Sequence, residues 1–273
     1  MKTLFSICLI AVLSASTFAQ TKRVAVVQFQ ADKLIESGDM FGGSDNDITR
    51  HFTKIAEDPR FNVMPILEQF HSLFFKDFAP KMPVEVLPEN VVLNNPAYKN
   101  FFQEVKKNPT GQKLLALAGK VDAQQNVTIK GYQPLIEEES TGLVATLSGT
   151  AKNAYQVQLM RIFDDQADGV MFFSLGFTMG SKKSLLGTLS GGTVQDGRML
   201  AYGDIRLYNR KGQKVFAIRK VGFSEQKYDR VLGSSIDLKP EDLLPMCESA
   251  AKNLFKELEE SFPKMTRKVD AKL

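Results

Sequence analysis

The carboxy-terminal third of the chain constrains the fold most, because three consecutive elements have clearly marked boundaries. Strand-like runs at 198–208 and 214–224 flank an Asn-Arg-Lys-Gly turn, and this close spacing predicts an antiparallel hairpin. A helix-like run follows from Asp237 to Phe262, and its apolar residues recur every three or four positions. They are Leu243, Leu244, Cys247, Ala250, Ala251, Leu254, Phe255 and Leu258. We expect this apolar face to bring a long C-terminal helix onto the sheet.

The amino-terminal part predicts a strand, a helix and a second strand. Residues 22–30 are predicted as a strand, because Val24–Val27 and Phe29 give a nearly continuous apolar run, which is typical of a strand covered on both faces. Asp45 or Asp47 can cap a helix that ends near Glu57. The run FNVMPILEQF, residues 61–70, is interpreted as a second strand, with its proline at an edge or a bend.

The middle of the chain alternates helical and extended patterns. A helical, proline-rich insertion is expected around 71–120, including a helix that starts at Pro96. A strand at 126–136, a helix at 155–163 and a strand at 170–179 follow. The predicted fold class is therefore α/β (α+β), with a mixed sheet of about five to six strands packed by amphipathic helices. We expect a single domain at 20–262 and a polar tail at 263–273.

The first residues have the layout of a secretory signal peptide. Lys2 precedes an apolar run from Leu4 to Leu13, and small residues at Thr17 and Ala19 mark a cleavage site. We expect residues 1–19 to be removed and the mature chain to be soluble, without a transmembrane segment. The expected location is the bacterial periplasm or the exterior.

Charge and cysteine content exclude some classes of function. The net charge is +4, and basic residues are interleaved with acidic ones along the chain, so no basic patch for nucleic acid is predicted. After signal removal Cys247 is the only cysteine. It is interpreted either as a reactive, partner-linking thiol or as a buried apolar side chain, and its place on the helix stripe favours burial.

The order of elements, with three short motifs, resembles the small α/β domain of bacterial envelope proteins such as the amino-terminal domain of TolB and the CsgG-like lipoproteins. The motifs are the opening VAVVQF strand (Val24–Phe29), the Ala167–Gly169 turn and the Asn209–Gln213 turn. The second motif lacks the usual aromatic partner, and Phe75–Pro109 has no counterpart. The resemblance implies binding and assembly and supplies no catalytic residues.

Catalytic and metal-binding patterns are weak. His51 and His71 are the only histidines, and no Gly-x-Ser-x-Gly motif accompanies them. Asp164–Gly169 begins like a calcium loop, but Leu175 occupies the twelfth position, where a carboxylate is required. The densest acidic cluster, Glu137–Glu139, is typical of a solvated loop. We predict no cofactor and no metal.

A glycine-rich stretch, Gly180–Gly197, contains two lysines and several hydroxyl groups. A phosphate-binding loop would lead into a helix, whereas a strand is predicted after this stretch. It is interpreted as a long connection between strands or as a partner-binding loop. The candidate binding residues are Lys182, Lys183, Leu185, Leu186 and Leu189.

These patterns leave three hypotheses for function. The leading one is a non-enzymatic, exported envelope protein that acts as a binding or assembly component with a protein partner. The second is a secreted hydrolase that uses a pair of carboxylates on glycans or peptides. The third is a subunit of an oligomeric envelope complex, including a homo-oligomer.

Overall fold

The computed structural model describes residues 21–36, 46–107, 126–133, 155–181, 194–231 and 237–262, together with Val269 and Leu273. The strands are β1 (Arg23–Glu36), β2 (Glu85–Val86), β3 (Asn126–Thr128), β4 (Gly169–Ser181), β5 (Val194–Asn209), β6 (Lys214–Phe223) and β7 (Tyr228–Val231). The helices are α2 (Asn46–Glu57), α3 (Met64–Leu73), η2 (Phe74–Phe78), η3 (Ala79–Lys81), α4 (Glu89–Leu93), α5 (Pro96–Lys107), α8 (Tyr155–Ile162) and α9 (Pro240–Ser261). Among these helices, none is long and apolar enough to cross a membrane.

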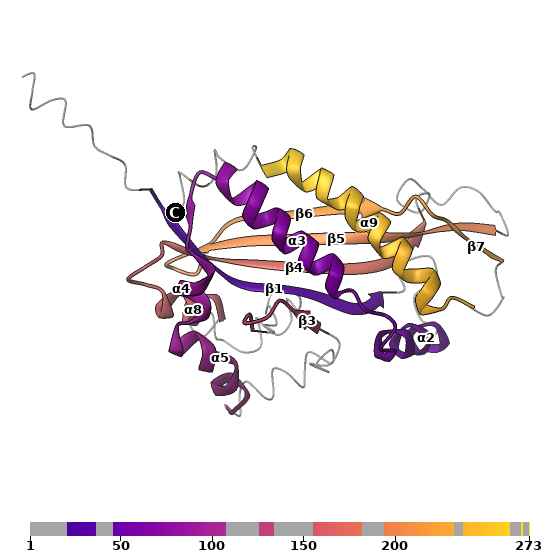
Figure 1. The fold of residues 1–273 in the computed structure, drawn as a ribbon, viewed down its shortest axis with the longest axis horizontal. Helices are drawn as coiled ribbons and strands as arrows, with labels where there is room; N and C mark the ends of the chain where they lie inside the picture. The colour runs from indigo at the N-terminus through magenta and orange to yellow at the C-terminus, as the bar shows by residue number, and fades with distance from the viewer. Residues whose placement is uncertain are drawn as a thin grey trace, which may run out of the picture.

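The strands form one mixed sheet in the order β2-β1-β4-β5-β6 (Figure 1). β1 runs parallel to β4, and β4, β5 and β6 form an antiparallel meander. On the other edge of β1, β2 pairs with its start and β3 with residues 30–32, while β7 pairs with the start of β5. The expected mixed α/β sheet with a long C-terminal helix is confirmed.

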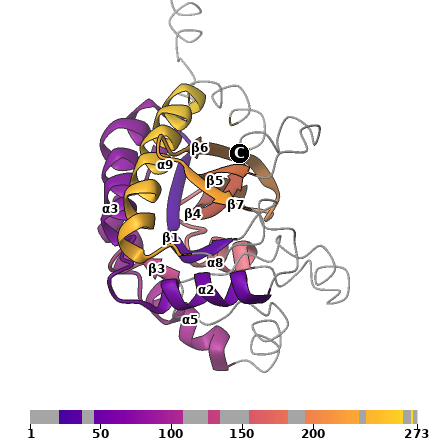
Figure 2. The same cartoon turned by 90° about the vertical axis from the view of Figure 1, so that its right-hand side faces the viewer.

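Helices cover the two faces of the sheet unequally. α3 and α9 lie side by side across one face, as both views show (Figures 1 and 2). On the other face, buried side chains of α4, α5 and α8 join a smaller apolar cluster with the start of β1 and β4. In Figure 1 these three helices gather at the end where β1 and β4 begin. Within the described residues, these three helices cover only the end of this face at which β1 and β4 begin.

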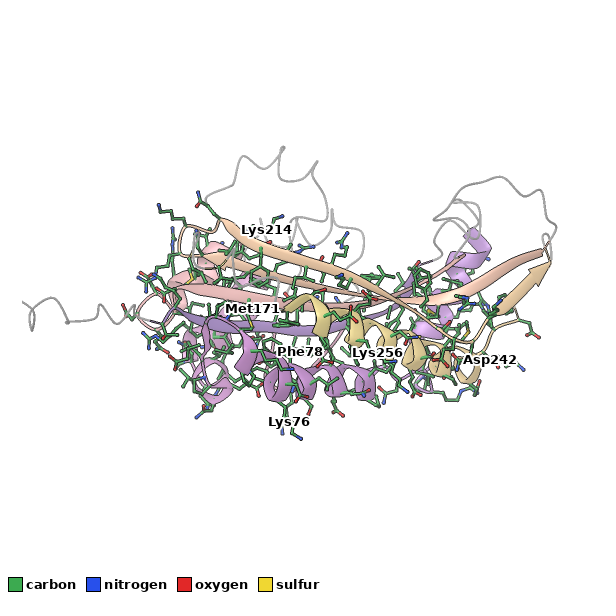
Figure 3. All side chains as sticks on the ribbon, turned by 90° about the horizontal axis from the view of Figure 1, so that it is seen from above. Lys76, Phe78, Met171, Lys214, Asp242 and Lys256 are labelled. Carbon is green, nitrogen blue, oxygen red and sulfur yellow. The ribbon has the colours of Figure 1, made fainter. Side chains whose placement is uncertain are left out.

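The core beneath α3 and α9 is built from aromatic rings. Phe29 of β1 stacks on Phe173 of β4 with ring centroids 4.6 Å apart. Phe70 of α3 stacks on Phe255 of α9 at 5.1 Å, which joins the two helices above the sheet. Figure 3 shows the amphipathic arrangement: Lys76 points away from the sheet, whereas Phe78 in the same turn lies on the inner side. Such rings bury large apolar areas and give a core that needs no disulfide.

The C-terminal helix contacts the sheet very closely at one glycine. A Cβ atom added to Gly222 of β6 would lie 2.1 Å from the Leu254 nitrogen and 2.2 Å from the Ala250 oxygen. The backbone of α9 therefore rests directly on the strand, which only glycine permits. Cys247 on the same helix face is fully buried, and this burial raises the pKa of its thiol. The interpretation of Cys247 as an apolar core residue is confirmed.

The prediction of a strand at residues 61–70 was wrong, because most of this run forms helix α3. Pro65 occupies the first turn of the helix, where its missing N–H breaks no intrahelical hydrogen bond. Ile66, Leu67 and Phe70 are buried, and their spacing of one and three residues matches one helical face. No strand forms at 61–70, and β1 pairs in parallel with β4 along most of its length and with the two-residue β2 at its start.

The strands and the long helix predicted in the C-terminal part of the chain, from β4 to α9, are present with modest changes of length. The hairpin of β5 and β6 turns at Gly212, whose φ of 71° lies in the left-handed region that favours glycine. β4 and β5 pair as far as Ser181 opposite Gly197, which confirms a strand-to-strand connection. β5 begins earlier than predicted, so the connection is shorter than the glycine-rich stretch suggested.

Candidate functional site

A row of polar side chains crosses the sheet from β1 to β6. Successive register partners place four residues side by side: Gln30, Ser174, Asp204 and Arg219. Gln28 and Arg206 adjoin them, and we call these six residues the polar row. Their sequence neighbours Phe29, Phe173, Ile205 and Ile218 point into the core beneath α3 and α9. Because side chains alternate along a strand, the row faces the opposite side.

A register irregularity in β1 brings Gln28 onto this face. The pairing of β1 with β4 shifts between Val26 and Gln28, so the chain accommodates an extra residue there. Val27 belongs to the apolar cluster on the row's face, and Gln28 donates to Ser174 on the same face. The sequence contains a signal for this arrangement: two glutamines interrupt the apolar run Val24–Ala31 at alternate positions.

The glutamine side chains are buried without full hydrogen bonding. Gln28 is 0% exposed, and its Nε2 donates to Ser174 Oγ at 3.0 Å. Its Oε1 has no partner in the structure, and neither has Oε1 of half-buried Gln30. Turning the Gln28 amide over would only exchange the satisfied and unsatisfied atoms. Each such group costs about 1–3 kcal/mol, so this part of the row is unfavourable for stability.

The other end of the row is cationic. Asp204 accepts from Arg206 through Nε at 3.0 Å and Nη2 at 2.5 Å, and from Arg219 Nη2 at 2.9 Å. The side chains of Asp204 and Arg206 are only 7% and 12% exposed, whereas Arg219 is 68% exposed. One carboxylate thus serves two guanidinium groups, and the three together carry a net positive charge. The accessible part of that charge belongs to Arg219.

The row lies at a boundary on this face. On one side, Val170, Phe172 and Tyr208 belong to the apolar cluster that α8 helps to cover. On the other side, the Tyr202 ring lies on Gly176, where an added Cβ would come within 2.2 Å of the ring Cζ atom. The row thus holds buried amide oxygens and one exposed guanidinium group between two apolar surfaces. Its accessible polar group is the Arg219 guanidinium, which is 68% exposed.

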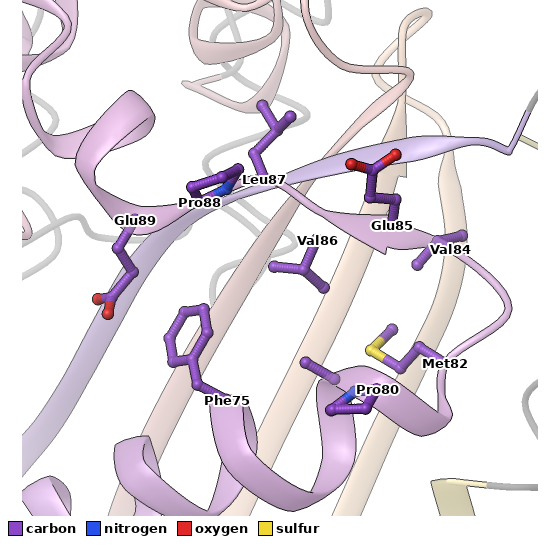
Figure 4. A pocket seen from close by; sticks show the side chains of 10 residues that line it. Phe75, Pro80, Met82, Val84, Glu85, Val86, Leu87, Pro88 and Glu89 are labelled. Carbon is purple, nitrogen blue, oxygen red and sulfur yellow. The ribbon is translucent and has the colours of Figure 1, made fainter.

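A second region is an apolar hollow between η2, η3 and the segment around β2 (Figure 4). It has a volume of about 430 Å³, and Phe75, Pro80, Met82 and Val86 line it. Figure 4 shows Val86 directed toward Phe75 and Pro80, whereas Glu85 leaves the strand on the opposite side. Glu85 and Glu89 therefore do not face one another across the hollow, as the carboxylates of a glycoside hydrolase would.

Glu89, at the edge of this hollow, is part of a three-residue cluster. Its Oε1 lies 2.8 Å from His71 Nε2 and accepts from Tyr132 Oη at 2.9 Å. Burial alone would raise the pKa of Glu89, but the hydrogen bonds from His71 and Tyr132 outweigh it and the pKa is lowered. The His71 ring packs against Phe29 at 5.0 Å and Phe75 at 4.9 Å. The cluster ties α3, α4 and the segment after β3 together.

The remaining candidates from the sequence have structural roles or lie outside the described residues. His51 Nε2 lies 2.9 Å from the Leu238 carbonyl oxygen. Asp168 accepts from the Arg23 backbone N–H at 2.9 Å and pairs with Lys22 and Arg210, so this carboxylate supports the start of β1. Within the part of the chain that the structure describes, no group of three His, Cys, Asp or Glu side chains could hold a metal ion.

The partner-binding residues predicted in the glycine-rich stretch fall outside the described ranges, as does the acidic cluster. The former are Lys182, Lys183, Leu185, Leu186 and Leu189, and the latter is Glu137–Glu139. Both assignments stay predictions. Sequence reasoning missed the polar row instead, although the alternating glutamines in an apolar strand were visible.

Comparison with known proteins adds little. No protein-family model matches the chain, and no curated protein sequence matches it either. Among solved structures, the chain is similar to lipoprotein GNA1162 from Neisseria meningitidis, with 12% sequence identity and a TM-score of 0.26. That alignment covers 87% of this chain and 99% of the lipoprotein. A TM-score this low supports no inference about fold or function.

Proposed function

We propose that the chain is an exported, non-enzymatic protein of the bacterial cell envelope that binds a partner through the polar row. The observation that carries this proposal is the guanidinium group of Arg219, 68% exposed, at one end of a row whose Gln28 and Gln30 oxygens are buried and unpaired. The unpaired oxygens cost stability, and a sheet face that retains them beside an accessible charge is suited to binding rather than to stability alone.

Export and envelope location rest on the amino-terminal sequence. Lys2, the apolar run Leu4–Leu13 and the small residues Thr17 and Ala19 support removal of a signal peptide. The resemblance to the TolB and CsgG-like domains supports a role in binding or assembly. Whether the partner is another protein or a second copy of this chain is decided by the experiment below.

A pair of equally exposed valines allows the proposal to be tested without altering the row. Val221 lies on β6 opposite Tyr202, two residues beyond Arg219, and Val91 lies on α4; each is 39% exposed. A photo-cross-linking amino acid would be placed at either position in the full chain, expressed in its native bacterium. We expect a discrete adduct from position 221 and none from position 91.

The mass of the adduct identifies a protein partner or a second copy. Equal labelling from both positions, or no adduct at 221, would refute binding at this face. The same preparation tests export, since mass spectrometry of the purified protein should show a chain that begins after Ala19. An uncleaved chain confined to the cytoplasm would refute the envelope location.

A further inference from the structure

We propose that the apolar hollow between η2, η3 and β2 binds a small apolar molecule that carries one positively charged amine. The apolar part of the ligand occupies the hollow, and its ammonium group pairs with the carboxylate of Glu89. The hollow shares no residue with the polar row, so this inference goes beyond the proposed function.

The hollow has the size and the lining of a small-molecule site. Its volume of about 430 Å³ lies within the range of about 300–1,000 Å³ that is typical of ligand pockets. Phe75, Pro80, Met82 and Val86 give it apolar walls, and Phe75 and Val86 are only partly buried, so apolar surface stays accessible. A hydrocarbon group that packs against these walls removes their surface from water, which is favourable.

Glu89 supplies an anionic acceptor at one end of the hollow, where its side chain is 32% exposed. Its Oε1 lies 2.8 Å from His71 Nε2 and accepts from Tyr132 Oη at 2.9 Å, whereas Oε2 has no hydrogen bond within the described part of the chain. A carboxylate offers about four lone-pair sites on its two oxygens, so Oε2 can accept from an ammonium group. Because the pKa of Glu89 is lowered, the carboxylate is ionised at neutral pH.

The carboxylate lies close to the aromatic wall of the hollow. Glu89 and Phe75 both contact His71, at 2.8 Å from its Nε2 and at 4.9 Å between ring centroids. Figure 4 shows the Glu89 carboxylate next to the Phe75 ring. A ligand that packs on Phe75 therefore needs only a short linker to bring its amine to Glu89.

The charges around the hollow favour a cation. Among the described residues that line it, the charged ones are Glu85 and Glu89, and both are acidic. The lysines of η2 and η3 do not compensate them, because Lys76 points away from the sheet and Lys81 pairs with Glu259 at 3.4 Å. An anionic ligand such as a fatty acid would be repelled, whereas an ammonium group is attracted both to a carboxylate and to the face of an aromatic ring.

A methionine in the wall of the hollow allows binding to be observed at the site. The mature full chain would be isotope-labelled in its methionine methyl groups, and the NMR signal of Met82 would be assigned from the Met82→Leu variant. Phenylpropylamine is the probe, phenylpropanol lacks its charge, and phenylbutyrate reverses it. We expect the amine to shift the Met82 signal, and the alcohol and the acid to bind at least about tenfold more weakly, the equivalent of one ion pair.

Substitutions separate the two parts of the site. Glu89→Gln removes the charge and keeps the size of the side chain, so it should weaken binding of the amine at least about tenfold and binding of the alcohol much less. Val86→Phe fills the hollow and should weaken binding of all three ligands. Glu68→Gln removes an acidic group at an exposed position on α3 and should bind as the unaltered protein does. The unchanged signals of the other methionines establish that the variants are folded.

The outcomes separate this inference from the proposed function. Equal or tighter binding of the alcohol or the acid, or unchanged affinity of the amine for Glu89→Gln, would overturn the assignment of a cationic ligand. A Met82 signal that none of the three ligands shifts would overturn the site itself. An adduct from Val221 without binding of the amine removes only this inference, and binding of the amine without that adduct removes only the proposed function.

Discussion

Replacing Gln28 by methionine is expected to stabilise the protein, although most substitutions of buried residues destabilise. Gln28 is 0% exposed, and its Oε1 has no hydrogen-bond partner. Methionine has a similar length, is unbranched and carries no polar group that requires a partner. The change removes a penalty of about 1–3 kcal/mol and forfeits the bond to Ser174, worth about 1 kcal/mol. The expected net gain in the free energy of unfolding is about 1 kcal/mol.

Equilibrium denaturation of the mature full chain in urea measures this gain. The midpoint should rise with an unchanged slope, and the melting temperature should rise by about 2–4 °C. Adding Ser174→Ala should retain the gain or increase it, because both members of the hydrogen-bonded pair are then apolar. Gln69→Met is the control, since exposed substitutions usually change stability by less than about 0.5 kcal/mol.

A loss of about 1 kcal/mol or more in Gln28→Met would refute the reasoning. It would mean that Oε1 accepts a hydrogen bond in the folded chain, so that the row has no unmet acceptor there. Gln28 would then be an ordinary hydrogen-bonded core residue. A gain in stability would identify Gln28 as a side chain that is retained at the expense of stability.

Three further predictions concern the scaffold. Gly222→Ala should lower the free energy of unfolding by about 3 kcal/mol or more, measured in urea, because its Cβ would collide with the Leu254 backbone; little change would contradict the close approach of α9. The unaltered protein should be more stable than the Glu89→Gln variant, fully so above pH 4.5, the ordinary pKa of glutamate. This difference in the free energy of unfolding should diminish as the pH falls through the lowered pKa of Glu89. A difference that grows toward low pH would contradict the lowered pKa. Cys247 should react with a thiol reagent at the rate of global unfolding, and rapid labelling of the native protein would contradict its burial.

Much of the architecture was predictable because local patterns coincide with the tertiary arrangement. The hairpin of β5 and β6 and helix α9 each carry a complete signal: alternation, a glycine turn and an apolar stripe. The run at residues 61–70 was misread because a short apolar segment with a proline fits an edge strand or a first helical turn. Its spacing of buried residues, not its composition, distinguishes the two.

The candidate site was much less predictable. Gln28 and Arg219 lie far apart in the sequence, and three strand pairings bring them onto one row. A shift of one residue in any pairing would move side chains to the opposite face. The register shift beside Gln28 is a tertiary feature of this kind, since it depends on how β1 pairs with β4.

The sequence by itself determined an α/β fold, its C-terminal hairpin and helix, and a buried Cys247, because hydrophobic periodicity dictates which faces must leave water. Only the tertiary structure decided that β1 pairs with β4, that α9 rests on Gly222, and that two amide oxygens remain unpaired beside a cationic cluster. The physical reason is that hydrogen-bond satisfaction and charge balance depend on partners distant in the chain, which local periodicity does not encode.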